Sequence, residues 1–212
     1  GRVGATTDPF FIGLEAGWLI NGVNERLGFA NWGIDRDKFD LRDELVPLFA
    51  YTGNLAESWE TPDPLTIVFH IRKGVQWQDK QPMNGRELTA EDVEFTLKRI
   101  KGWGKEGVPL QQFDIFRMPI KSITATDKYT VVVKMEQPSR DAVNSFINGT
   151  MAWILPPEVI EQYGDASDWR NLVGTGPFML TDWVDGSSLT WTKNPDYWGY
   201  DEKYPQNRLP YV

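Results

Sequence analysis

The sequence contains no cysteine and only one histidine, His70, among its 212 residues. Disulfide bonds, cysteine nucleophiles, zinc-finger spacings and multi-histidine metal sites are therefore excluded from this chain. A surface or structural role is the default for the one histidine, and no GxSxG motif supplies a nucleophile for it to activate. We expect no catalytic residue, no metal ion and no cofactor.

An excess of positive charge is also missing. Thirty acidic and 22 basic side chains give a net charge of −8. Nucleic acids and anionic membrane surfaces bind basic protein faces, so neither is an expected partner. No run approaches the roughly 20 apolar residues of a membrane span. The remaining composition, with 41% apolar and 25% charged residues, is typical of a globular protein.

Tryptophan is the residue in excess, with ten copies. Such large side chains most often fill a core or an interface between elements. The alternative is that two or three of them line a pocket and stack against a ligand. The composition leaves both interpretations open.

Two motifs match known sites by letter only. Residues 102–107 read GWGKEG and fit GxGxxG, but they follow an expected helix and meet Pro109, so we predict a loop. Asp35 and Asp37 hint at a calcium loop, but Phe39 occupies the next ligand position. Paired carboxylates would suit a glycosidase, yet nothing singles out two among thirty acids.

The clearest local pattern lies between residues 65 and 102. Every second residue from 65 to 71 is apolar, which predicts a strand with one strongly apolar face. Asn84-Gly85 predicts a tight turn. Thr89 is a good N-cap for a helix that Gly102 closes, because its hydroxyl accepts a bond from an unpaired amide of the first turn.

Further elements follow along the chain, and they mix strands with helices. Two hairpins are predicted around the turns Asp127-Lys128 and Asp185-Gly186, and a short helix is expected after each of Pro138 and Pro156. A further helix at 14–29 is weakened by two glycines. The fold class predicted from the residues is a mixed α/β (α+β) domain.

Five blocks of residues, read in order, resemble one known family. They are LAESWE (55–60), FHIRKGVQW (69–77), LTAEDVEFTLKRI (88–100), ITATDKYTVVVKMEQP (123–138) and VGTGPFMLTDWVDGSSLTWTKNPDYW (173–198). Their joint order is similar to that of the family 5 extracellular solute-binding proteins, which serve peptide and other ABC importers. Asn24-Glu25-Arg26-Leu27 also stands where that family often has "yE.L".

The resemblance implies an architecture. Family members have two lobes that close around a ligand, and each lobe has the type II periplasmic-binding-protein fold, a mixed sheet flanked by helices. Residues 1–212 then form the N-terminal lobe, with a main part at about 1–50 and 169–212 and an extra subdomain at about 51–168. The second lobe is expected to be absent from this chain, and a signal segment is expected to have been removed.

The resemblance also implies a function. The protein would be the substrate-binding component of an ABC importer, capturing a peptide or a related small solute and delivering it to a membrane permease. It would be a monomer without enzymatic activity, periplasmic or extracellular, with a lipid anchor as one means of attachment. Ligand contacts would favour the closed form of the two lobes, which the permease recognises.

Candidate ligand contacts come from three segments that the resemblance points to, and ordinary packing remains the alternative for each. The candidate contacts are Gly13, Leu14 and Glu15, then Gln112 and Phe113, then Asn148 and Trp153.

The Gly174-Thr175-Gly176-Pro177 motif predicts a constrained backbone turn, with a role near a cleft as the second interpretation.

Two rival classes stay open. The tryptophans and acids also suit a carbohydrate-active enzyme or a sugar-binding module, and the enzyme would need two carboxylates facing each other across a groove. A structural or adaptor domain would instead present a flat, polar face.

Overall fold

The computed structural model describes residues 20–31, 34–35, 37, 47–103, 114–149 and 152–200. The chain divides into two compact units that alternate along the sequence. Unit 1 draws on Gly1–Glu25, Lys73–Leu88 and Leu155–Val212, and unit 2 on Arg26–Arg72 and Thr89–Ile154. The predicted boundaries of a main lobe and an extra subdomain at about 51–168 stay a prediction.

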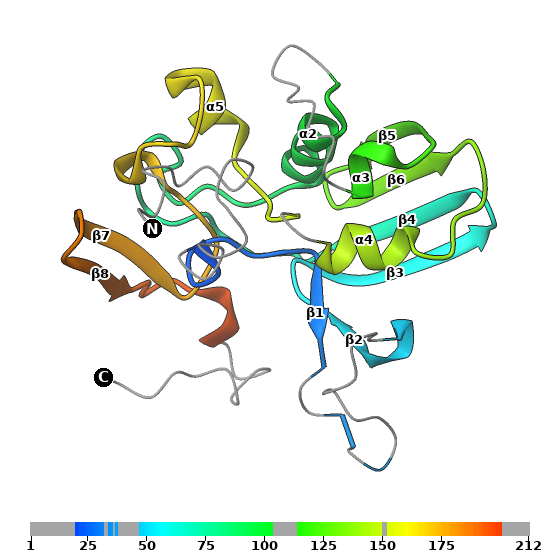
Figure 1. The fold of residues 1–212 in the computed structure, drawn as a ribbon, viewed down its shortest axis with the longest axis horizontal. Coiled ribbons are helices and arrows are strands. Elements are labelled where there is room, and N and C mark those ends of the chain that lie inside the picture. The colour runs from blue at the N-terminus through cyan, green and yellow to red at the C-terminus, as the bar shows by residue number, and fades with distance from the viewer. Residues whose placement is uncertain are drawn as a thin grey trace. The chain divides into compact units, whose positions relative to one another are not determined.

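Unit 2 is built on a four-stranded antiparallel sheet (Figure 1). The central strand predicted from alternation forms as β4, where Ile67, Phe69 and Ile71 are buried. Leu65 precedes that strand and is exposed. In the order of the sheet the strands are β3 (Ala56–Asp63), β4 (Thr66–Ile71), β6 (Thr130–Met135) and β5 (Ile120–Asp127).

The helix α2 (Ala90–Lys101) packs against β5 and β6. Thr89 and Asp92 form a capping box at its start, in which the Thr89 amide donates to the Asp92 carboxylate at 2.9 Å. Gly102 ends the helix in the left-handed conformation, at φ 78°. The predicted N-cap and C-cap are therefore confirmed, and the first glycine of the GxGxxG match is the cap of a helix.

The remaining elements of unit 2 are short. Phe146 on α4 meets Phe69 on β4 edge to face at 5.9 Å between ring centroids, so that helix packs on the sheet. The strand β1 begins at Gly28, so the helix expected at 14–29 is wrong at that end. These elements are α3 (Asp114–Arg117), α4 (Ala142–Asn148), β1 (Gly28–Ala30), β2 (Tyr51–Gly53) and the 3-10 turn η2 (Leu48–Ala50).

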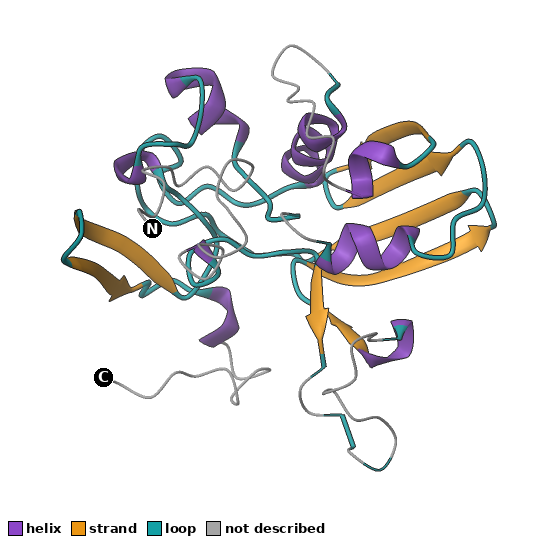
Figure 2. Cartoon of the chain, in the orientation of Figure 1, coloured by secondary structure: helices purple, strands orange, loops and turns teal. Residues whose placement is uncertain are grey.

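Unit 1 contains the second predicted hairpin and little other regular structure (Figure 2). Its strands pair antiparallel, and Gly186 in the connecting turn has φ 70°. Asn84 and Gly85 both have positive φ, as a tight turn of their type requires. The elements are α5 (Pro157–Tyr163), η3 (Trp169–Asn171), β7 (Phe178–Val184), β8 (Ser188–Lys193) and η4 (Trp198–Tyr200).

The two units together give the mixed α/β class that the sequence predicts. Among the described residues, no helix combines the length and the apolar character needed to cross a membrane.

A bidentate ion pair links residues 73–88 of unit 1 to α5. Arg86 Nε and Nη2 donate to the two carboxylate oxygens of Glu158 at 2.6 and 2.7 Å. Burial alone would raise the pKa of Glu158, but the hydrogen bonds and charge of Arg86 outweigh it, so this pKa lies below its usual value. The pair therefore stabilises the fold above the pKa of an unfolded glutamate, and that contribution is lost as the pH falls through the folded value.

Replacing Arg86 with methionine tests this ion pair. We expect Arg86→Met to lower the free energy of unfolding by about 1 kcal/mol at pH 7, because the pair is partly exposed. The difference from the unsubstituted protein should shrink as the pH falls through the lowered pKa of Glu158, where its carboxylate becomes protonated. Urea unfolding at several pH values measures it, with the exposed Arg140→Met as control. A difference that is constant across pH would contradict the assignment.

Candidate functional site

Glu25 gathers residues from three separate parts of unit 1. Its carboxylate is buried, with 8% of the residue exposed. Thr175 Oγ1 and Trp198 Nε1 each donate to Oε2 at 2.8 Å, and Tyr197 OH donates to Oε1 at 3.2 Å. A buried carboxylate satisfied in this way holds segments together. Glu25 is thus a structural acid, and it joins residues 24–27 to both ends of the 173–198 block that carried the resemblance.

The Gly174–Pro177 motif crosses the backbone of residues 22–24 at close range. The amide of Gly176 donates to the Val23 carbonyl at 2.8 Å, and the amide of Phe178 donates to the Gly22 carbonyl at 2.9 Å. A β-carbon added at Gly174 would lie 1.9 Å from the Val23 oxygen. Backbone packing accounts for the glycines, which supports the structural interpretation of this motif.

Two of the candidate contacts, Asn148 and Trp153, meet around Arg26 in unit 2. Arg26 Nη1 donates to Asn148 Oδ1 at 2.9 Å, and the guanidinium carbon lies 4.3 Å from the centre of the Trp153 ring. Arg26 lies two residues before the start of β1, whereas Asn148 is the last residue of α4. The three side chains are therefore brought together by the segment before β1, the end of α4 and the segment after α4. We call them the Arg26 cluster.

The electrostatics of the Arg26 cluster are those of a partly desolvated cation. Trp153 is buried, and Arg26 is half-buried. Burial lowers the pKa of Arg26 and the nearby Tyr51 raises it, although a guanidinium remains charged at neutral pH. Its Nε atom is buried without a hydrogen-bond partner. Among the described residues, no carboxylate forms an ion pair with it.

The other candidate contacts, Gly13, Leu14, Glu15, Gln112 and Phe113, lie outside the described residues. Sequence reasoning did not single out Arg26 as a contact. The residue stands in the "yE.L" segment, but 122 positions separate it from Asn148, and no local pattern connects them.

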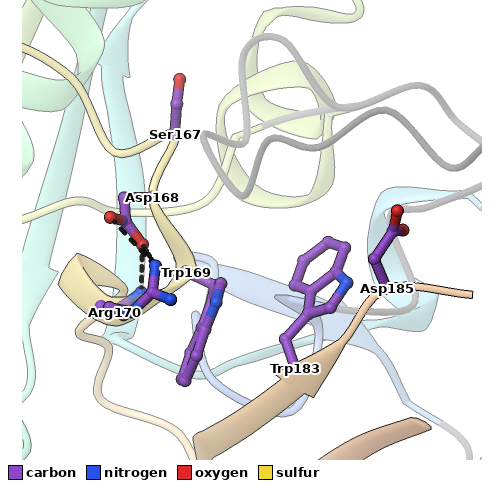
Figure 3. Close-up of a pocket in the computed structure, with 6 residues that line it drawn as sticks. All are labelled: Ser167, Asp168, Trp169, Arg170, Trp183 and Asp185. Carbon is purple, nitrogen blue, oxygen red and sulfur yellow. Dashed lines mark hydrogen bonds and ion pairs between the residues drawn. The ribbon is translucent and has the colours of Figure 1, made fainter. Parts of the chain in front are cut away.

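Unit 1 has a concavity of about 460 Å³ beside two tryptophans (Figure 3). Trp169 projects from η3 and Trp183 from β7. The guanidinium of Arg170 lies 4.9 Å from the Trp169 ring centre and is ion-paired with Asp168 at 3.2 Å. Asp168 also caps η3. The described residues that line it are Ser167, Asp168, Trp169, Arg170, Trp183 and Asp185.

The described lining of this concavity does not offer the pair of facing carboxylates that the glycosidase alternative requires. Of the two carboxylates among these residues, that of Asp168 is already engaged by a cation and a helix end. Two tryptophans do line a hollow, as one interpretation of the composition expected, but nothing in the geometry selects a ligand. We assign it no function.

No metal or triad site is found in the described part of the chain. No three histidine, aspartate or glutamate side chains group together there as metal ligands. His70 lies 3.5 Å from Glu60 and its side chain is 39% exposed, which fits the default surface role.

The fold is that of type II periplasmic binding proteins, a class that binds small solutes. The match to the solute-binding protein MoaA of A. tumefaciens R10, in complex with mannopinic acid, has a TM-score of 0.72 at 25% identity, covering 93% of this chain and 36% of that one. Residues 50–211 match the model of "Bacterial extracellular solute-binding proteins, family 5 Middle". The chain belongs to this family.

Two curated relatives from Escherichia coli K12 agree with that membership. The dipeptide-binding protein is 30% identical over 195 residues, which is 84% of this chain and 36% of the relative. The probable deoxycholate-binding periplasmic protein YgiS is 30% identical over 159 residues, which is 67% of this chain and 28% of the relative. The chain thus spans about a third of the length of the proteins that it matches.

Proposed function

We propose that the chain is the N-terminal lobe of the substrate-binding component of an ABC importer. It captures a peptide or a related small solute outside the cytoplasm and delivers it to a membrane permease. Membership of the solute-binding family is the observation that carries this proposal. The share of the relatives covered by the chain supports a lobe, with the second lobe contributed by sequence beyond these residues.

The proposed mechanism is capture without bond breaking. Contacts from both lobes favour the closed arrangement, and the permease responds to closure. The protein acts as a monomer in the periplasm or outside the cell, and a lipid anchor is one means of holding it there. Family membership supports the location and the absence of catalysis.

Within the lobe, we propose that the Arg26 cluster contributes to the solute site. Asn148 offers an amide beside a stacked cation, and both are only partly covered. Gly13, Leu14, Glu15, Gln112 and Phe113 remain proposed contacts from the resemblance. The ligands named for the relatives are a dipeptide, mannopinic acid and deoxycholate, and all three carry a carboxylate.

A ligand screen on the intact protein tests the function. Dialanine, trialanine, mannopinic acid, deoxycholate and neutral oligosaccharides are added separately while the melting temperature is followed. Because a ligand that binds only the folded state stabilises it, at least one peptide or acid should raise the melting temperature in a concentration-dependent way. Mass spectrometry should find each compound unchanged.

Hydrolysis of a peptide or an oligosaccharide would contradict the proposal, as would stabilisation by oligosaccharides alone. Asn148→Ala should weaken binding of the compound that stabilises most. The exposed Glu161→Ala on α5 provides a control that leaves the Arg26 cluster intact.

A further inference from the structure

Within the described residues, two arginines stack on tryptophan rings, and only one of them has a counter-ion there. Arg170 lies 4.9 Å from the Trp169 ring centre and is ion-paired with Asp168 at 3.2 Å. Arg26 lies closer to its ring, at 4.3 Å, and the one hydrogen bond that its side chain makes with the described residues goes to the neutral amide oxygen of Asn148. The two stacks therefore differ in whether the cation has a counter-ion.

Arg26 is the more buried of the two arginines, so the lack of a counter-ion among the described residues is costly for it. Taking a charge out of water is costly unless an opposite charge or several hydrogen bonds replace the water. The chain carries thirty acidic side chains, and none of those in the described residues pairs with Arg26. The Trp153 face stabilises the cation in part, but it does not neutralise it.

The surroundings also restrain the guanidinium. Its carbon lies over the Trp153 ring and its Nη1 atom is bonded to Asn148, so two contacts hold the group. Nη2 makes no hydrogen bond with the described residues. A planar fork held in this way matches the two oxygens of a carboxylate better than a flexible ammonium would.

We propose that Arg26 receives a carboxylate of the bound solute, so that the lobe selects solutes carrying that group. This inference rests on the proposed function and specifies its ligand class. Trp153 and Asn148 act as positioning residues for the guanidinium. The group supplied by the solute is the counter-ion that the described residues do not provide.

The test compares acids with their amides on the intact protein. Dialanine, trialanine, mannopinic acid and deoxycholate are titrated calorimetrically, each as the free acid and as the primary amide. Removing the negative charge should weaken binding by about tenfold or more in the unsubstituted protein, because a charge-assisted pair is lost. An amidated peptide with a glutamate side chain shows whether a side-chain carboxylate can substitute for the terminal one.

Substitutions then place the effect on one residue. Arg26→Met should bind acid and amide forms alike, because the charge that tells them apart is gone. Arg26→Lys keeps the charge without the fork and should restore part of the preference. Arg170→Met removes the other stacked arginine and should leave the preference unchanged.

Each outcome decides the inference. Equal affinity for acids and amides in the unsubstituted protein would overturn it while leaving the proposed function intact. An Arg26→Met protein that still prefers acids as strongly as before would also overturn it. If Arg26→Met does not fold, the unsubstituted protein and Arg26→Lys still decide. If none of the compounds binds, both the inference and the proposed function are wrong.

Discussion

Replacing Gly174 with alanine is expected to prevent stable folding of unit 1. The added β-carbon would lie 1.9 Å from the carbonyl oxygen of Val23 and 2.5 Å from its carbonyl carbon. These are backbone atoms, and the Val23 oxygen also accepts the Gly176 amide at 2.8 Å. Neither of the two crossing backbone segments can therefore move aside at a small cost in free energy. We expect a loss of more than about 4 kcal/mol, in the range reserved for severe steric or core disruption.

Urea unfolding followed by tryptophan fluorescence measures this loss, together with the soluble yield. Gly186→Ala is the matched control, since a β-carbon there meets no atom within 4 Å and only the positive φ of 70° is unfavourable. That substitution should cost about 1 kcal/mol. A Gly174→Ala protein as stable as Gly186→Ala would show that the close crossing is not a property of the folded chain.

At the Gly174–Pro177 motif, only part of the geometry could be predicted from the sequence. Two glycines and a proline before a strand predict a constrained backbone, and the structure has one. The partner at Val23 is about 150 residues away in the chain, and no local pattern identifies it. The sequence predicts that the backbone of this motif packs closely against another segment. The fold determines that this segment is the backbone of residues 22–24.

The regular elements could be predicted because their sequence patterns are local. The period-two alternation of β4, the Thr89 and Gly102 caps of α2 and the two hairpin turns all act within a few residues. Their energetics are set by neighbours in sequence, so the residues alone are enough. The helix expected at 14–29 failed at its described end, where the chain enters β1 by pairing with β2. Sheet pairing there overrides a weak helical pattern that glycines already interrupt.

In the candidate site, too, only some of the residues could be predicted. Family resemblance pointed to Asn148 and Trp153, and the structure brings them together. It did not point to Arg26, because the neighbours that a cation has among the described residues are set by three-dimensional packing. The sequence shows only that an arginine follows Glu25. Two neighbouring residues thus serve different units: the acid is satisfied within unit 1, and the base stacks within unit 2.

The role of Glu25 leads to the second large effect. Glu25→Ala is expected to lower the free energy of unfolding by about 3 kcal/mol, because Thr175 Oγ1 and Trp198 Nε1 lose their buried charged acceptor. Glu25→Gln should lose less, since an amide oxygen in the place of Oε2 can still accept both bonds, although without the charge. Urea unfolding gives the values, and the emission of Trp198 should shift as its indole N–H is released. Glu161→Ala, exposed on α5, should change stability by less than about 0.5 kcal/mol. If Glu25→Ala unfolds at the same urea concentration as Glu161→Ala, the carboxylate does not hold these segments together, and its burial would need another explanation.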